Sequence, residues 1–193
     1  YVTSKARELG IEVIYQEFNL IETLSAAENI FLGCKTGKLV NQKIMNDKAK
    51  QLFQEFEIDI APDSMIRDLS PAQQQIIEIL KAVSKNAQIL IMDEPTAPLT
   101  MKEVELLFKI INKLQKEGVT IIYISHRLDE IFEIADRVTV MRDGNYIGTK
   151  LISETNKKQL VAEMVGRELQ ETYPDAKMVL GETALELQNV SGN

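Results

Sequence analysis

Two adjacent carboxylates and the single histidine of the chain each follow an apolar run. Asp93 and Glu94 come directly after residues 89–92, and His126 stands two positions beyond residues 119–124. Open α/β sheets place their ligands at the carboxyl ends of parallel strands, so these side chains could share one edge. An Asp there can hold Mg²⁺ directly or through water, and a neighbouring Glu can take a proton from a water that attacks a phosphate. The pattern favours phosphate chemistry, with phosphate contact for His126, over the alternative that the acids only cap the following turn.

Two other polar positions could contact an anion or a cation. Ser70 suits a helix N-cap and Pro71 suits the first helical position, and such a helix start offers free N–H groups to an anion. Gln16 follows the apolar run 11–15, where its amide could ligate Mg²⁺ or orient a water. Each pattern alone also fits an ordinary role, a well-capped helix for Ser70 and an exposed loop residue for Gln16.

The elements that must position these side chains form a strand, helix and strand unit. Residues 89–92 are all apolar and residues 119–124 are apolar apart from Thr120, as expected of strands that are buried on both faces. Between them, Thr100 and Glu103 form a capping-box pattern, and Gly118 suits the helix C-terminus. The helix has one apolar stripe, made of Val104, Leu107, Phe108, Ile111 and Leu114. We predict a right-handed βαβ unit in a parallel sheet that is covered on both faces.

Further periodic segments complete the expected organisation. Helices are predicted over residues 43–56, 127–135 and 157–165, and strands over 137–142, 146–148 and 184–190. The dipeptide Asp143-Gly144 predicts a tight hairpin, and Gly166 should end the last of these helices.

Composition limits the classes of protein to which the chain can belong. Its 193 residues are 45% hydrophobic and 26% charged, which is typical of a globular domain, and no apolar run approaches the roughly 20 residues of a membrane helix. A net charge of -7 argues against a broad basic surface for nucleic acid or anionic lipid. The single Cys34 cannot form an internal disulfide, which fits a reducing cytosol. The start at Tyr1 has neither an initiator Met nor an apolar signal core, and we interpret it as a cut within a longer chain.

Taken in order, these motifs resemble the ABC ATPase family over residues 11–150. Gln16 corresponds to the glutamine loop, Ser70 opens the signature helix, Asp93-Glu94 ends the Walker B strand, and His126 is the switch histidine. Three further features resemble the sugar-importer branch of this family, which has two ATPase domains in one polypeptide. They are the segments Gln16-Glu17-Phe18-Asn19-Leu20 and Ala27-Glu28-Asn29-Ile30-Phe31-Leu32-Gly33, and the glutamines of the signature.

The resemblance implies an α/β fold, a partial parallel-sheet core of the P-loop NTPase type with an inserted helical subdomain at about residues 26–85. Residues 1–166 would be a partial first ATPase domain, 167–183 a linker, and 184–193 the start of a second ATPase domain.

The resemblance also implies roles for individual positions. These are Gln16 for Mg²⁺ and water, Asp93 for Mg²⁺, Glu94 as general base, His126 for the γ-phosphate, and Ser70, Ala72 and Gln73 for the γ-phosphate of a partner site. Three departures from the family pattern matter. No Gly-x-x-x-x-Gly-Lys-Ser/Thr loop occurs, Pro71-Ala72 replaces the usual Gly-Gly, and Thr100 stands where many relatives have an Asp.

The implied activity is hydrolysis of ATP, with Mg²⁺, to power import of a monosaccharide. The expected partners are transmembrane permease subunits, a second ATPase domain that completes a nucleotide sandwich and, indirectly, a periplasmic or extracellular sugar-binding protein, with no nucleic acid. The expected location is the cytoplasmic face of the cell membrane. Two alternatives stay open: a soluble ABC-type ATPase of DNA repair or translation, and a non-catalytic assembly module in which the half-site is only a docking surface.

Overall fold

The computed structural model describes residues 4–33 and 41–166, which fall into two compact units that divide between Asp136 and Arg137. Cys34, the expected linker 167–183 and the expected strand at 184–190 lie outside the described residues. None of the helices in the described part of the chain is long and apolar enough to cross a membrane.

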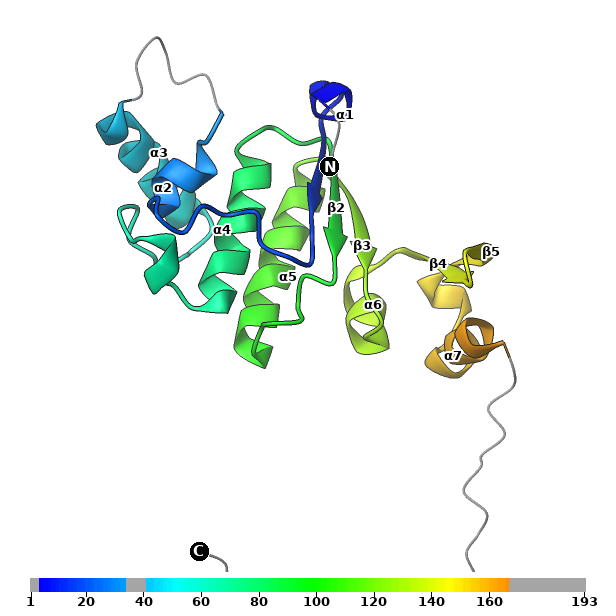
Figure 1. Ribbon diagram of the computed structural model, residues 1–193. Coiled ribbons are helices and arrows are strands. Elements are labelled where there is room, and N and C mark those ends of the chain that lie inside the picture. The colour runs from blue at the N-terminus through cyan, green and yellow to red at the C-terminus, as the bar shows by residue number, and fades with distance from the viewer. Residues whose placement is uncertain (1–3, 34–40, 167–193) are drawn as a thin grey trace, which may run out of the picture. The chain divides into compact units, whose positions relative to one another are not determined.

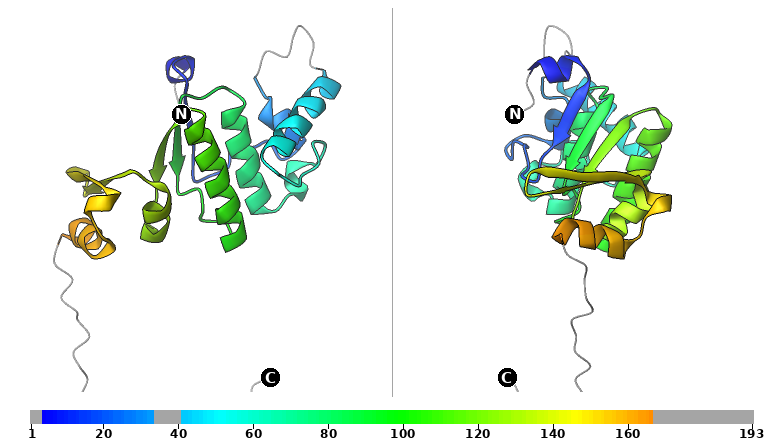
Figure 2. Two further views of the ribbon diagram at one scale, coloured as in Figure 1. Left: turned by 180° about the vertical axis from the view of Figure 1, so that it is seen from behind. Right: turned by 90° about the vertical axis from the view of Figure 1, so that its right-hand side faces the viewer.

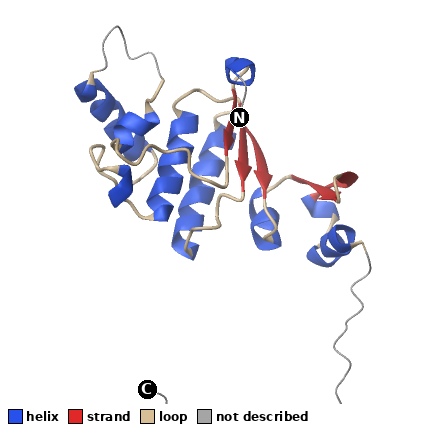
Figure 3. Ribbon diagram, viewed as in Figure 1, coloured by secondary structure: helices blue, strands red, loops and turns tan. Residues whose placement is uncertain are grey.

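The first unit contains a three-stranded parallel sheet with most of its helices on one side (Figures 1 and 3). Its strands are β1 (Ile11–Ile14), β2 (Ile89–Asp93) and β3 (Thr120–Ile124), in that order across the sheet. Ile14 pairs with Met92, which pairs with Tyr123, so all three strands end at one edge. The parallel βαβ arrangement predicted from the sequence is confirmed.

The helices α4 (Pro71–Val83) and α5 (Met101–Lys116) connect these strands and lie on the same face of the sheet (Figures 1 and 2). The start of α5 follows the expected capping box, because the Glu103 carboxylate accepts hydrogen bonds of 2.7 Å from both N–H and Oγ of Thr100. All five residues of the predicted apolar stripe of α5 are buried. They pack in one core with Ile14, Leu90 and Met92 of the sheet.

Side chains on the opposite face of the sheet are partly exposed, so this open face is not fully covered within the described part of the chain, which corrects the prediction that both faces are covered. Ile122 and Ile124 keep 47% of their surface exposed, and Ile11, Val13 and Ile91 are only half-buried. Both crossover helices lie on the other face, because two right-handed crossovers in the same direction across a sheet place their helices on one side. Apolar residues allow the face of a strand to pack against another element. The face is buried only where such an element lies over it.

The remaining helical segments of the first unit fall into two sets along the chain, one between β1 and α4 and one near the first and last residues of the unit. Between β1 and α4 are α2 (Ala26–Ile30), α3 (Gln42–Glu55) and the 3-10 turn η1 (Ile66–Asp68), and near the ends are α1 (Ser4–Glu8) and α6 (Leu128–Ile134). The predicted helices 43–56 and 127–135 correspond to α3 and α6. Helix α3 buries Met45, Ala49 and Phe53, which are spaced on one face.

The second unit is a hairpin with a helix. Strands β4 (Arg137–Arg142) and β5 (Asn145–Leu151) are antiparallel, and η2 (Ile152–Glu154) and α7 (Lys157–Val165) follow. Asp143 and Gly144 both have positive φ, 52° and 74°, the backbone that a two-residue hairpin turn needs. Gly166 ends α7 in the left-handed conformation, with φ of 81°. The predicted hairpin and helix end are confirmed, and the returning strand is longer than 146–148.

Candidate functional site

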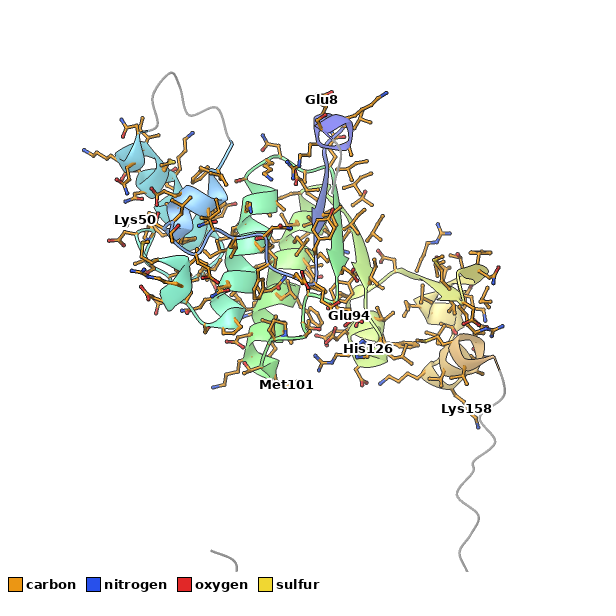
Figure 4. All side chains as sticks on the ribbon, viewed as in Figure 1. Glu8, Lys50, Glu94, Met101, His126 and Lys158 are labelled. Atoms are coloured by element: carbon orange, nitrogen blue, oxygen red, sulfur yellow. The ribbon has the colours of Figure 1, made fainter. Side chains whose placement is uncertain are left out.

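The structure brings Glu94 and His126 into contact at the carboxyl edge of the sheet. Oε1 of Glu94 and Nδ1 of His126 are 2.8 Å apart, and Figure 4 shows both side chains below the ends of β2 and β3. Glu94 is 31% exposed and His126 69%. The N–H of Glu94 donates to the Ile124 carbonyl at 2.9 Å, so the strand pairing continues one residue past β2. The parallel pairing of β2 with β3 accounts for this meeting of residues that are 32 positions apart.

The hydrogen bond leaves one atom of each side chain free to bond to a substrate or a water. When Nδ1 carries the ring proton it donates to Glu94, and Nε2 then keeps a lone pair that can accept a hydrogen bond. Oε2 of Glu94 takes no part in this bond and can accept a proton from a water. A carboxylate with one oriented oxygen and a histidine beside it can serve proton transfer next to a charged substrate.

Asp93 and Gln16 lie at the same edge of the sheet. Asp93 is the last residue of β2 and alternates with Ile91, which puts it on the open face of the sheet, where it is half-buried. Gln16 is exposed in the bend two positions after β1, the strand next to β2. Within residues 4–33 and 41–166, no group of three or more His, Cys, Asp or Glu side chains could hold a metal by itself.

The start of α4 has the cap that the sequence predicted. Oγ of Ser70 accepts from the Gln73 N–H at 3.3 Å, and the Gln73 Oε1 accepts from the Ser70 N–H at 2.9 Å, with Pro71 at the first helical position. Ser70 is exposed, whereas Ala72 is buried. Among the described residues, no hydrogen bond or ion pair joins this helix start to Glu94 or His126. The structure thus separates the seven candidate residues into a group at the sheet edge and a group at the start of α4.

Glu130, a buried carboxylate near the pair, was not predicted from the sequence as a site residue. It is 4% exposed, and its Oε2 accepts hydrogen bonds from Thr96 at 2.9 Å, Tyr123 at 2.8 Å and Ser125 at 3.3 Å. Nη1 of Arg127 lies 2.6 Å from its Oε1. Burial, and next the hydrogen bond to Glu130, raise the pKa of the Tyr123 hydroxyl, so Tyr123 stays a donor. The sequence does contain a signal for the burial of Glu130, because this residue falls on the same side of α6 as Ile131 and Ile134.

A second missed group fixes the segment that follows Gln16. Nζ of Lys81, on α4, donates to the Asn19 carbonyl at 2.5 Å and lies 3.7 Å from Oε1 of Glu78. Both side chains are nearly buried, and burial raises the pKa of Glu78 and lowers that of Lys81. Oε2 of Glu78 is buried without a hydrogen-bond partner. The pair therefore ties the loop beyond β1 to α4 at an electrostatic cost.

Comparison with known proteins shows that the chain is similar to ATP-binding cassettes. The family model described as ABC transporter matches residues 2–97. The ribose import ATP-binding protein RbsA of Bacillus cereus is 46% identical over 190 residues, and that of Shouchella clausii is 48% identical over 191, each match covering 96% of this chain and 38% of the relative. A putative ribose/galactose/methyl galactoside import ATP-binding protein of Geobacillus kaustophilus is 45% identical with the same coverage. The chain thus spans less than two-fifths of the length of these relatives.

Solved structures of ATP-binding cassettes have the same fold. The dimeric post-hydrolysis state of the cassette MJ0796 bound to ADP and Pi has a TM-score of 0.65 at 25% identity, over 74% of this chain and 62% of that chain. The cassette MJ1267 has a TM-score of 0.69 at 22% identity, over 83% and 70%. The parallel sheet and its helices are therefore a partial P-loop NTPase-like core with an inserted helical subdomain.

Proposed function

Since this chain belongs to the ABC transporter family, we propose that its sheet edge is the hydrolysis half of an ATP site in a sugar importer. The hydrogen bond between Glu94 and His126 is the observation that carries this proposal. It holds a potential proton acceptor and a potential phosphate contact together at the edge where α/β sheets bind ligands.

Glu94 is the general base in this proposal. Its Oε2 would accept a proton from the water that attacks the γ-phosphate, while Oε1 stays bound to His126. With both ring nitrogens protonated, His126 would donate from Nδ1 to Glu94 and from Nε2 to a γ-phosphate oxygen, and Gln16 would orient the water from the end of β1. Positioning and charge stabilisation supply most of the catalysis in phosphoryl transfer, so the fixed geometry of this pair matters more than its intrinsic basicity.

The residues at this edge fit Mg²⁺ as the metal. Protein sites for Mg²⁺ usually offer one or two oxygen ligands and leave the others to substrate phosphates and water. Asp93 and Gln16 would supply such oxygens from the ends of β2 and β1. When bound, the ion would neutralise charge that develops on the phosphate oxygens.

The second group of candidate residues would act on a different nucleotide. Ser70, Gln73 and the Ala72 N–H at the start of α4 would contact the γ-phosphate bound by a facing ATPase domain, and their separation from Glu94 supports this division. The MJ0796 cassette is dimeric in its post-hydrolysis state, which is consistent with such a facing arrangement. The cap can stay closed, because both side chains only accept in it, which leaves the Ser70 hydroxyl hydrogen and the Gln73 Nε2 amide as donors to a phosphate.

The transport partners follow from the names of the relatives. Their names specify import of ribose or galactose-type sugars, so we propose a monosaccharide as cargo, transmembrane permease subunits as direct partners, and a sugar-binding protein as an indirect one. The chain would work at the cytoplasmic face of the membrane. We also propose residues 1–166 as a partial first ATPase domain, 167–183 as a linker and 184–193 as the start of a second.

The change Glu94→Gln in the natural full-length protein tests the assigned reaction. Glutamine keeps the shape and can still accept from His126, but it cannot take the proton of the attacking water. We expect steady-state ATP turnover to fall by on the order of 10²- to 10⁴-fold, while Mg-ATP binding measured by calorimetry survives. Glu133→Gln, on the exposed side of α6, is the matched control. Turnover close to wild type in Glu94→Gln would exclude the role of general base.

A further inference from the structure

One buried carboxylate is hydrogen-bonded to both loops that carry the Glu94–His126 pair. Glu130 accepts from Thr96, two positions after Glu94, and from Ser125, which directly precedes His126. Its charge is balanced by Arg127, which directly follows His126. The carboxylate therefore holds the loop after β2 and the loop after β3 at a fixed separation.

On the histidine side, the contacts of Glu130 shape the backbone itself. Oγ of Ser125 donates to Glu130 and at the same time accepts from the Arg127 N–H at 2.9 Å. This bond between positions two apart closes a tight turn with His126 at its centre. Because Arg127 is also paired with Glu130, both neighbours of His126 are fixed to one buried acid.

On the glutamate side, the contacts restrain a residue in an uncommon conformation. Glu94 has φ of +46°, in the left-handed region that non-glycine residues seldom adopt. Such a residue keeps its conformation only where surrounding bonds restrain it. Thr96 is 2% exposed and its hydroxyl bonds to Glu130, which anchors the far end of this turn.

We propose that Glu130 is a positioning residue that sets the geometry of the Glu94–His126 pair, and thereby the rate of the hydrolysis step. The rate part of this inference rests on the proposed function, whereas the geometric part does not. Glu130 does not bond to either member of the pair in the structure, so it acts through Thr96, Ser125 and Arg127.

The geometric part is tested in this 193-residue chain by nuclear magnetic resonance, because His126 is its only histidine. The imidazole resonances would be compared in the wild-type chain, Glu130→Gln, the control Glu133→Gln, and Glu94→Gln as the reference for an altered partner. We expect Glu130→Gln to move the His126 resonances and Glu133→Gln to leave them unchanged. If the resonances in Glu130→Gln coincide with those of the wild-type chain, the proposal is overturned.

Thr96→Val provides a second variant should Glu130→Gln fail to fold. It keeps the size of the side chain and the Arg127–Glu130 pair, and removes the Thr96 hydroxyl that anchors the Glu94 loop to Glu130. The same displacement of the His126 resonances is expected, and its absence would equally overturn the proposal. Tyr123→Phe removes another donor to Glu130 from within β3, outside both loops, and should shift the resonances less.

The rate part is tested by ATP turnover in the natural full-length protein. We expect Glu130→Gln and Thr96→Val to lower kcat about tenfold or more, since a misplaced reacting group is costly, with KM for Mg-ATP changed less than about threefold. An unchanged kcat in both variants would overturn the positioning role while the proposed function stands. Absence of turnover in the wild-type protein would instead overturn the proposed function, and the resonances of His126 would still decide the geometric part.

Discussion

At the residue scale, Asp93 and Glu94 are neighbours with different surroundings. Asp93 still belongs to β2 and lies on the open face of the sheet, whereas Glu94 has left the strand with φ of +46° and bonds to His126. One position is therefore suited to a cation that approaches the sheet edge, and the other to proton transfer. Adjacent residues can take separate roles because the backbone turns between them.

This difference predicts separable defects in the full-length protein. Asp93→Asn should raise the Mg²⁺ concentration for half-maximal ATP turnover by at least about tenfold, since losing a metal contact costs affinity, and excess Mg²⁺ should restore part of the rate. Glu94→Gln should not respond, because its missing function is proton acceptance. Turnover of both variants across a Mg²⁺ series is the measurement. Equal rescue of both variants would contradict the assignment of separate roles.

At the scale of elements, α4 connects the two groups of candidate residues. Its first turn carries the Ser70–Gln73 cap, and its last turns hold the loop after Gln16 through Lys81 and the Asn19 carbonyl. A movement of α4 would therefore be transmitted to the loop that carries Gln16. The Glu78–Lys81 pair makes this connection with nearly buried charges, for which desolvation is the dominant cause of both pKa shifts.

The pair predicts a non-additive effect on stability. Lys81→Met should lower the free energy of unfolding by about 3 kcal/mol, because Glu78 is then left without its partner. Adding Glu78→Met should recover most of this loss, to within about 1 kcal/mol of wild type, the cost of the bond to Asn19. Urea unfolding at pH 7 measures both, with Lys116→Met on the exposed end of α5 as control. Additive losses in the double variant would contradict this account.

The pH dependence of stability gives a check of the same pair. The pKa of Glu78 is raised above its ordinary 4.5, so the folded protein takes up this proton at a higher pH than the unfolded chain. Its contribution to stability is therefore fully present below the unfolded pKa and is lost as pH rises through the folded one. As the pH falls from 7 to 5, the free energy of unfolding of the wild-type chain should rise relative to that of Glu78→Gln.

At the scale of the whole molecule, the open face of the sheet is the largest departure from expectation. Ile122 and Ile124 are half-exposed on a strand whose other face is packed against the core. Contiguous exposed apolar surface of this kind attracts other apolar groups. The 193-residue chain should consequently bind a hydrophobic dye at this face.

Replacement of both isoleucines tests this expectation. The double change Ile122→Thr and Ile124→Thr keeps β-branched side chains and should cost about 1 kcal/mol of stability or less, because the sites are only half-buried. Dye fluorescence of the chain should fall. Met101→Thr, at an exposed single site at the start of α5, should leave the fluorescence unchanged. An equal fall in the control would show that the dye binds elsewhere.

The sequence by itself determined the strand ends and their common edge. Runs of apolar residues, the Thr100–Glu103 cap and glycines at helix ends depend on neighbours within a few positions, and the parallel crossover then fixes where the strands end. Asp93, Glu94 and His126 were therefore predictable as one group. The same local chemistry predicted Ser70 as the N-cap of α4 and the Asp143-Gly144 turn.

The tertiary structure alone decided the contacts between distant segments. Thr96 and Glu130 are 34 positions apart and Lys81 and Asn19 are 62 apart, and no periodicity in either segment specifies which faces meet. The open face of the sheet was likewise decided by the tertiary structure, because the apolar residues of a strand do not determine whether a helix covers them. Contacts of this kind depend on how packed elements lie against each other, which local sequence patterns do not encode.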